Sequence, residues 1–163
     1  MTKILVQPAP PEAMDTVANL MQLYSHDLSE YQEAPLDDRG LFRLGPCFDT
    51  YWEEPGRDPF LILVDTELAG FAFIRELAEQ SYSVAEFFIA SRFRCSGVGK
   101  VAVRGLFDKF RGNWQVAELE KNLPAQRFWR AVIDDYTGGE FTEQWSDVDP
   151  KGPMQVFTNI GGN

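Results

Sequence analysis

Cysteine and histidine are scarce in this sequence of 163 residues, which has two cysteines, Cys47 and Cys95, and one histidine, His26. Two distant cysteines form neither a CxxC pair nor a disulfide framework. With a single histidine, the chain also lacks the closely spaced ligands of a zinc site. We therefore expect no metal, and free thiols fit a reducing compartment.

Long apolar runs are also missing. The apolar stretch at residues 4–6 is much shorter than the core of a signal peptide, and prolines follow it at positions 8, 10 and 11. No run approaches the ~18 apolar residues that span a bilayer. The sequence therefore predicts a cytoplasmic protein without a membrane segment.

Basic residues are few: 15 Lys and Arg stand against 25 Asp and Glu, so the formal net charge is −10. Because a nucleic-acid-binding surface is basic, this balance argues against such a partner. A hydrophobic fraction of 44% with 25% charged residues is typical of a globular protein. The length predicts one domain over residues 1–163.

The charge is distributed unevenly along the chain. Residues 92–130 contain nine basic and three acidic residues, a net charge of +6. Residues 1–91 carry −11, from five basic and 16 acidic residues, and residues 131–163 carry −5, from one basic and six acidic residues. A basic segment within an acidic protein indicates a compact polyanionic ligand, such as a nucleotide-like cofactor.

Hydrophobic periodicity predicts the elements. Helices are expected at 14–28, from 97 to near 112, and at 123–133, with a short helix and loops over 27–59. Strands are expected at 3–7, 60–64, 69–77, 82–90, 114–119, 141–145 and 154–160. Antiparallel hairpins with one β-α-β crossover predict the α+β class with a mixed, mostly antiparallel sheet.

The segment Arg94-Cys95-Ser96-Gly97-Val98-Gly99 lies between an expected strand and an expected helix. Glycines at such a place let successive backbone N–H groups converge on one anion at the positive end of the helix dipole. Arg92 and Lys100 add charge beside it. The segment therefore predicts an anion-binding loop.

The same residues also satisfy a dinucleotide-binding fingerprint. Residues 97–102 read G-x-G-x-x-A, and Glu118 or Glu120 follows about 20 residues later. That fingerprint belongs to the first β-α-β unit of a doubly wound sheet, whereas only ~60 residues follow it here. Six residues, 91–96, also separate the expected strand from the first glycine. A dinucleotide-dependent oxidoreductase is therefore the less favoured alternative.

Two motifs together resemble the GNAT superfamily of acyl-CoA N-acyltransferases. The first is (Arg/Gln)-x-x-Gly-x-(Gly/Ala), here Arg94, Gly97 and Gly99, after the strand at residues 86–90. The second resembles Asn-x-x-Ala-x-x-(Phe/Leu)-(Tyr/Trp), here over residues 122–129. The resemblance implies a twisted sheet whose central strands, 82–90 and 114–119, splay apart into a V.

The resemblance also implies acetyl-CoA as the acyl donor. Its pantetheine arm would follow the backbone near Phe88, Ile89 and Ala90, with Asn122 and Phe128 beside the arm and the thiol. The N–H groups that would receive the pyrophosphate, with Arg94 nearby, are those of Cys95, Ser96, Gly97, Val98, Gly99 and Lys100.

Direct acetyl transfer to an amine needs a base, a donor to the carbonyl oxygen and a proton for the leaving thiolate. Glu86 is the first candidate base, because a carboxylate within an apolar strand can have a raised pKa. The same pattern fits a carboxylate that faces solvent or pairs with an arginine, and Glu118 and Glu120 are weaker candidates. Trp129 stands where many family members have the tyrosine that serves as the acid. Tyr136 or another tyrosine therefore substitutes for it, water supplies the proton, or the thiolate leaves unaided.

The acceptor is predicted less sharply. Carboxylates and aromatic residues are mixed over residues 24–59, which fits either a pocket for a cationic amine or a solvated acidic surface. We expect an N-acetyltransferase that acts on a small-molecule primary amine, and members of this family commonly form homodimers. The alternative from another class is a non-catalytic acyl-CoA-binding domain.

Overall fold

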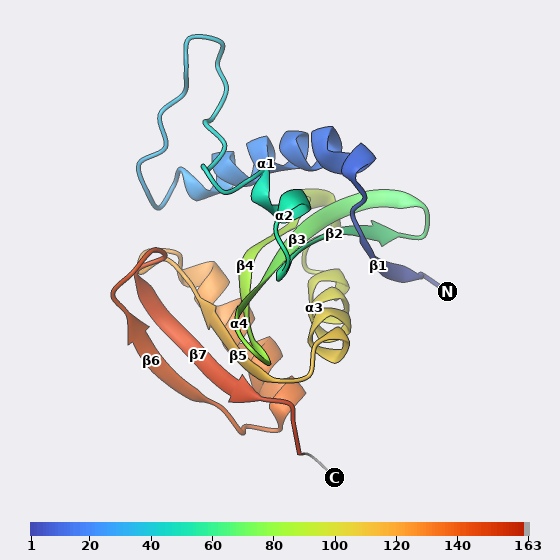
Figure 1. Cartoon of the computed structure of the whole chain (residues 1–163), viewed down its shortest axis with the longest axis vertical. Helices are drawn as coiled ribbons and strands as arrows, with labels where there is room; N and C mark the ends of the chain where they lie inside the picture. Colours follow the sequence, from blue (N-terminus) through green and yellow to red (C-terminus); the bar gives the residue numbers. More distant parts are fainter. Residues whose placement is uncertain (162–163) are drawn as a thin grey trace.

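The computed structural model describes residues 1–161. Seven strands in this part of the chain form one sheet in the order β1-β2-β3-β4-β5-β7-β6 (Figure 1). They are β1 (Ile4–Pro8), β2 (Arg57–Val64), β3 (Glu67–Ala78), β4 (Ser81–Ile89), β5 (Asn113–Ala117), β6 (Thr142–Ser146) and β7 (Gly152–Thr158). Neighbouring strands are antiparallel except for β4 and β5, which are parallel.

The helices are α1 (Met14–Leu28), α2 (Thr50–Glu53), α3 (Val98–Lys109) and α4 (Leu123–Thr137), with short 3-10 turns at Pro11–Ala13 and Ser91–Phe93. The helix expected at 123–133 continues to residue 137, where Gly138 ends it in a left-handed conformation (φ +64°). Glycine favours this conformation because it has no Cβ. The helix boundary was therefore predicted four residues too early.

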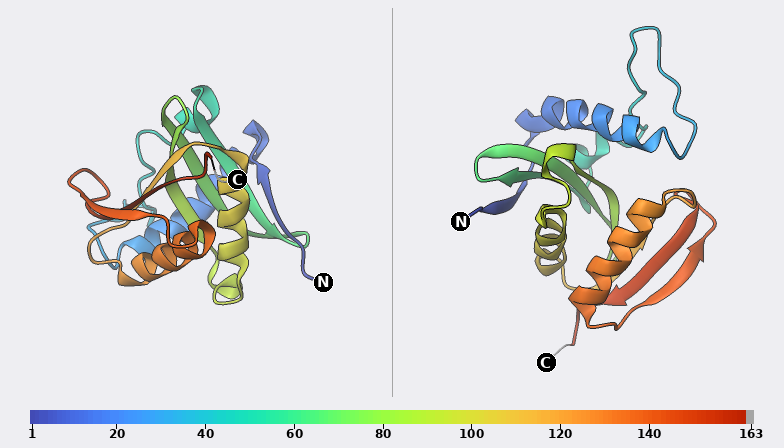
Figure 2. Two further views of the ribbon diagram at one scale, coloured as in Figure 1. Left: turned by 90° about the horizontal axis from the view of Figure 1, so that it is seen from below. Right: turned by 180° about the vertical axis from the view of Figure 1, so that it is seen from behind.

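Helices cover both faces of the sheet. Strand β3 alternates its buried side chains between the two faces: Phe71 and Phe73 pack with α1 and α2, whereas Ala72 and Ile74 pack with α3 and α4. Figure 2 shows α4 lying along β6 and β7 on the side of the sheet that α3 also covers. The mixed α+β class predicted from the sequence is confirmed.

The sheet divides between β4 and β5. These strands pair only from Ser81 to Ser83 against residues 113–115, and beyond that point they diverge (Figure 1). The V-shaped opening implied by the family resemblance is therefore present. A doubly wound dinucleotide-binding sheet is parallel, so the fingerprint at residues 97–102 is coincidental.

The segment between α1 and α2 extends away from the sheet as a long loop (Figure 1). Leu36 and Phe42 form an isolated antiparallel bridge within it. None of the helices among residues 1–161 is both long and apolar enough to cross a membrane.

Candidate active site

A bulge in β4 aims Glu86 toward α1. In the pairing of β3 with β4, Phe73 lies opposite Glu86 and Ile74 lies opposite Val84, so Ala85 is an extra residue in β4. Ala85 packs on the α1 face, whereas Val84 packs on the opposite face. A bulge of this kind interrupts the strict alternation of side chains. As a result, Glu86 also points to the α1 face, where Tyr24 and Asp149 are its neighbours.

Glu86 is partly buried beside aromatic side chains of α1 and α2. Burial raises the pKa of Glu86 to about 7, hydrogen bonding with Tyr24 opposes the rise, and the charge of Asp149 adds to it. Desolvation disfavours the charged carboxylate, which explains the direction. A carboxyl group with a pKa near 7 is suited to general-base catalysis at neutral pH.

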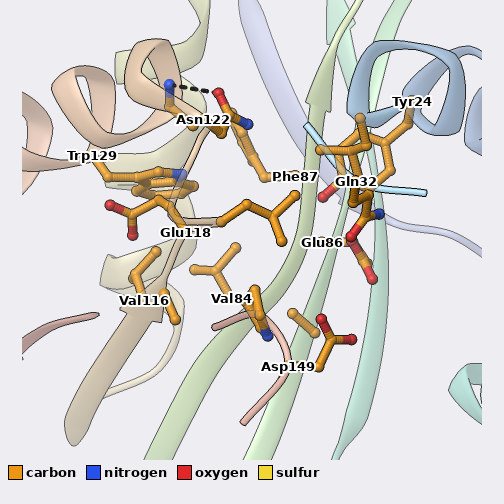
Figure 3. Close-up of a pocket in the computed structure, with 16 residues that line it drawn as sticks. Tyr24, Gln32, Val84, Glu86, Phe87, Val116, Glu118, Asn122, Trp129 and Asp149 are labelled. Atoms are coloured by element: carbon orange, nitrogen blue, oxygen red, sulfur yellow. Dashed lines mark hydrogen bonds between the residues drawn. The ribbon is translucent and has the colours of Figure 1, made fainter. Parts of the chain in front are cut away.

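The opening between β4 and β5 contains a pocket of about 170 Å³. Figure 3 shows Tyr24 and Glu86 on one side of the opening, and Glu118, Asn122 and Trp129 on the other. Its lining residues are Tyr24, Leu28, Gln32, Val84, Ala85, Glu86, Phe87, Val116, Ala117, Glu118, Leu119, Asn122, Ala125, Trp129, Asp149 and Pro150.

The edge of β4 that faces the pocket does not pair with β5 beyond Ser83. The Ala90 N–H donates to the Ala69 carbonyl of β3 at 2.8 Å. Because N–H groups of an antiparallel strand alternate in direction, the groups of Phe88 also face β3, whereas those of Phe87 and Ile89 face the opening. Of the three residues predicted to meet pantetheine, Ile89 is therefore the one whose groups face the opening. Its carbonyl accepts from Arg94 Nε, so the N–H is the group left for a ligand. The groups of Phe87 face the same way, with the Tyr24 hydroxyl beside them.

Tyr24 reaches this edge from α1. Its ring packs edge-on against Phe71 and Phe88, with ring centroids 5.7 and 6.1 Å away. Burial raises the pKa of Tyr24 well above its usual value, and the charge of Glu86 and hydrogen bonding with it raise the pKa further. Hydrogen bonding with the Phe87 backbone lowers it. The hydroxyl thus lies next to both Glu86 and the free edge of β4.

The predicted anion-binding loop has the backbone of an anion nest. Cys95 and Gly97 have left-handed conformations, with φ values of +58° and +84°. Val98 begins α3, and within residues 1–161 no N–H group from Cys95 to Lys100 donates to a backbone carbonyl. Unpaired N–H groups at a helix N-terminus bind phosphates. The loop therefore fits the pyrophosphate of a CoA ester.

Several basic side chains near the loop are already in ion pairs. Arg92 pairs with Glu67, and Arg94 pairs with Asp27. Lys100 pairs at 3.0 Å with Asp135 of α4, which Arg104 also contacts. The expectation that Arg92, Arg94 and Lys100 form a free positive cluster is thus met only in part, because acidic residues distant in the sequence neutralise them.

The N-terminus of α4 forms the other wall of the opening. The Asn122 side chain accepts a hydrogen bond from the Ala125 N–H at 3.1 Å and caps the helix (Figure 3). Gln126, which the sequence analysis did not single out, donates to the carbonyls of Leu119 and Glu120 at 3.0 and 2.9 Å. These bonds hold the chain where it leaves β5.

Phe128 contributes indirectly to the site. Its ring stacks on Phe87 with ring centroids 5.9 Å apart. A Cβ added to Gly99 would lie 3.1 Å from that ring, so Gly99 permits α3 and α4 to approach each other. Trp129 lines the pocket, whereas Phe128 supports the loop and β4 from behind.

Tyr136 lies outside the pocket. Its hydroxyl donates to Asp108 at 2.9 Å and accepts from Asn159, and its ring packs on Phe107 and Phe157. These partners belong to α3 and the C-terminal part of the chain. We therefore do not retain Tyr136 as the proton donor.

Glu118 is a pocket residue, but its carboxylate is engaged on the far side of β5. It accepts from Gln155 at 3.0 Å, and it is 4% exposed. Burial raises the pKa of Glu118 to about 8. Among the described residues, its Oε2 has no hydrogen-bond partner. Glu120 is exposed and does not line the pocket, so neither residue displaces Glu86 as the candidate base.

Sequence reasoning did not identify Phe87, Asp149 or Gln126 as site residues. Asp149 lies in the loop between β6 and β7, and its approach to Glu86 depends on the packing of distant strands. No local pattern in the sequence marks these positions. Within residues 1–161, no group of three or more His, Cys, Asp or Glu residues is arranged to hold a metal ion.

The sequence was compared with protein-family models and with curated proteins. The model of the acetyltransferase (GNAT) family matches residues 17–132. No curated protein matches the sequence.

Solved structures resemble the whole fold at low sequence identity. An acetyltransferase from Thermus thermophilus superposes with a TM-score of 0.69 at 14% identity, over 96% of this chain and 97% of the other. A GNAT acetyltransferase from Staphylococcus aureus gives 0.65 at 12% identity, over 96% and 99%. The aminoglycoside acetyltransferase AAC(6')-Ib in complex with coenzyme A gives 0.66 at 15% identity, over 96% and 95%. The chain belongs to the GNAT acetyltransferase family and is an acetyl-CoA-dependent N-acetyltransferase.

Proposed function

We propose that the protein transfers the acetyl group from acetyl-CoA directly to the primary amine of a small cationic acceptor. The charge of the pocket carries this proposal. The described residues that line it include the carboxyl groups of Glu86, Glu118 and Asp149 and no Lys, Arg or His. Because the pKa of Glu118 is about 8, that group is mostly protonated at neutral pH, so Asp149 and Glu86 supply the negative charge. Such a pocket favours a cation over a neutral or anionic compound.

The source of this charge differs from the one expected from the sequence. Of residues 24–59, only Tyr24, Leu28 and Gln32 line the pocket, and none of them is acidic. The negative charge comes instead from Glu86 of β4 and Asp149 of the β6–β7 loop, and the third carboxyl group, Glu118, directly follows β5. The acidic residues of segment 24–59 therefore do not support the proposed preference for a cationic acceptor.

Glu86 acts as the general base in the proposed reaction. It faces Tyr24 and Asp149 at the pocket, and its pKa of about 7 leaves a large ionised fraction at neutral pH. A protonated amine has no free electron pair, so the acceptor first releases one proton to solvent and binds as the neutral amine between Glu86 and Asp149. Glu86 then accepts a second proton from the nitrogen as it attacks the thioester carbonyl.

Backbone N–H groups of β4 stabilise the charge that develops on the carbonyl oxygen. The N–H groups of Phe87 and Ile89 face the opening, where β5 no longer pairs with β4, and the thioester oxygen would replace the Tyr24 hydroxyl as the acceptor of the Phe87 N–H. Fixed donors of this kind need no reorganisation during the reaction. The loop from Cys95 to Lys100 would bind the pyrophosphate and so set the position of the thioester relative to this edge.

An amine panel tests the proposed function. Release of CoA thiol is measured with acetyl-CoA and diamines, monoamines, and amines that also carry a carboxylate. We expect the highest kcat/KM for acceptors with a second positive charge, and a selective loss for these acceptors in Asp149→Asn. Equal rates for all three classes would overturn the cationic acceptor. Tight acetyl-CoA binding without acetylation of any amine would favour the non-catalytic acyl-CoA-binding alternative.

A further inference from the structure

The leaving thiolate lacks an evident proton donor in this site. Trp129 stands where the family motif often has tyrosine, and an indole N–H is not an acid of useful strength in this reaction. Trp129 is 6% exposed, and its ring packs edge-on against both Phe87 and Phe128. Tyr136 is hydrogen-bonded to Asp108 outside the pocket. Another acid must serve the reaction or the thiolate must leave unaided.

Tyr24 is the tyrosine among the pocket's lining residues. Its hydroxyl neighbours two groups that the proposed reaction uses, the Glu86 carboxylate and the Phe87 backbone N–H. In Figure 3 the Tyr24 ring projects from α1 over the part of β4 that contains Glu86. This arrangement joins α1 and β4 at the free edge of the opening.

We propose that the Tyr24 hydroxyl is a catalytic residue that donates the proton to the leaving thiolate, and that Glu86 returns to it the proton taken from the amine. This inference rests on the proposed function, because it assumes acetyl transfer with Glu86 as base. It adds a proton donor that neither motif contains.

Glu86 and Tyr24 together account for the proton that leaves the amine and the proton that reaches the thiolate. The neutral amine nitrogen, which has already released the extra proton of its ammonium form to solvent, forms a bond to the carbonyl carbon and passes one proton to Glu86. The carbon–sulfur bond breaks, its electron pair stays on sulfur, and the sulfur takes the Tyr24 proton. The protonated Glu86 then reprotonates the tyrosinate. The products are the N-acetylated amine and free CoA thiol, and both side chains recover their starting state.

The position of the Phe87 N–H places the hydroxyl near the reacting atoms. This N–H faces the opening, and in the structure the Tyr24 hydroxyl is its neighbour. A carbonyl oxygen that replaces the hydroxyl as the acceptor of the Phe87 N–H therefore lies next to that hydroxyl. The thioester sulfur is bonded to the same carbonyl carbon, so it lies two bonds from the carbonyl oxygen.

The charge state of Glu86 matches the order of the two transfers. While Glu86 is ionised, its negative charge raises the pKa of Tyr24 and keeps the phenol protonated. When Glu86 accepts the amine proton, that charge disappears and the phenol becomes a stronger acid. Tyr24 thus becomes a better donor at the stage when the thiolate departs.

Tyr24→Phe removes the hydroxyl but keeps the ring contacts with Phe71 and Phe88. We expect kcat to fall about 100-fold, the lower range of general-acid effects, with unchanged acetyl-CoA affinity by calorimetry. In the wild type, kcat should also decline at high pH as the phenol ionises, and this decline should be absent from the variant. Tyr31→Phe, in the loop after α1 and outside the pocket, is the matched control and should retain wild-type kcat.

A titration tests the Tyr24–Glu86 contact without any acceptor. The Tyr24 ring is followed by NMR with ¹³C-labelled tyrosine across high pH, in the wild type and in Glu86→Gln. We expect the Tyr24 pKa to fall in Glu86→Gln, because the charge that raises it has been removed. An unchanged Tyr24 titration would overturn the proposed pair even if no acceptor is acetylated.

The two proposals fail differently. If Glu86→Gln loses activity while Tyr24→Phe keeps full kcat, the Tyr24 proposal is wrong and the base assignment stands. If Glu86→Gln keeps full activity, the base assignment is wrong, and the proton circuit fails with it. Loss of acetyl-CoA binding in Tyr24→Phe would indicate a structural contribution and would also overturn the catalytic assignment.

Discussion

Arg94 in the loop after β4 forms an ion pair with Asp27 in the last turn of α1. The same guanidinium donates through Nε to the Ile89 carbonyl at 2.6 Å and lies over the Phe88 ring, 5.5 Å from its centroid. The first residue of the anion-binding motif is therefore engaged by α1 and β4. This geometry indicates that Arg94 holds the end of β4 in place, and it is not primarily a free phosphate contact.

Substitutions at Arg94 can separate these two roles. Lysine keeps the charge but cannot make the forked contacts of the guanidinium. We expect Arg94→Lys and Arg94→Ala to weaken acetyl-CoA binding to a similar extent, about 10-fold, the equivalent of one lost charge-assisted hydrogen bond. Calorimetry at low and high salt measures this effect. Wild-type affinity in Arg94→Lys, with a strong salt dependence in Arg94→Ala, would instead favour long-range attraction of phosphate.

Gly97 and Gly99 of the loop are required for different structural reasons. Gly97 has φ +84° and open space where a Cβ would lie, whereas a Cβ on Gly99 would press on Phe128. We expect Gly97→Asp to abolish acetyl-CoA binding while the protein stays folded, because a carboxylate would stand at the anion nest. Gly97→Asn is the matched neutral control, since asparagine tolerates left-handed conformations.

Circular dichroism with calorimetry checks the effect of the Gly97 substitutions. Equal loss of binding in Gly97→Asn and Gly97→Asp would show that backbone geometry, and not charge, is responsible. Substitution of Gly99 is a poorer test, because it would disturb the packing of α3 on α4 as well as the loop.

The pH dependence of catalysis follows from Glu86. A base must be ionised to accept a proton, so kcat/KM should rise with pH and level off above an apparent pKa of about 7. Glu86→Gln should lower kcat by about 100- to 10,000-fold and remove this rise. Steady-state kinetics from about pH 5.5 to 9 measure both effects, for acceptors whose own amine pKa lies outside the range. A rise that persists unchanged in Glu86→Gln would assign the titration to another group.

The pH dependence of stability follows in part from Glu118. Its pKa is about 8 in the folded protein and near the ordinary value of ~4.3 in the unfolded chain. The folded state therefore binds the Glu118 proton more tightly than the unfolded chain does. The contribution of Glu118 to the free energy of unfolding is complete below the unfolded pKa, and it is lost as the pH rises through 8.

Glu118→Gln should flatten this loss of stability. An amide stays neutral at all pH values, so the variant should be more stable than the wild type at about pH 8.5 and should differ less at about pH 5. Urea unfolding at the two pH values measures the free energies. Glu120→Gln, an exposed neighbour, is the control. A wild-type protein whose stability does not decline relative to Glu118→Gln would show that Glu118 titrates normally.

Local patterns predicted most elements, because helices and strands are specified by periodicities of 3.6 and 2 along the chain. The strand at residues 60–64 begins earlier, at Arg57, since pairing with β3 continues past Pro59 to Arg75. This extension depends on a neighbouring strand. The loop at residues 94–99 between a strand and a helix was also predictable, because its glycines, the preceding strand and the following helix are contiguous.

The catalytic arrangement was predictable only in part. Glu86 is conspicuous as a carboxylate in an apolar strand, but its direction depends on the bulge at Ala85, and no turn residue marks that bulge. Asp149 lies 63 positions away in the chain and is placed by the β6–β7 loop. The neutralisation of Arg94 by Asp27 likewise joins residues 67 positions apart.

The sequence by itself determined the α+β class, the position of the glycine loop between β4 and α3, and the family resemblance, because contiguous residues encode each of them. The tertiary structure decided which groups face the opening. It brought Tyr24 to Glu86, turned Tyr136 away, and gave the pocket the charge of Asp149. These outcomes depend on how α1, the β6–β7 loop and the divergent strands pack, and such contacts between distant residues leave no periodic pattern in the chain.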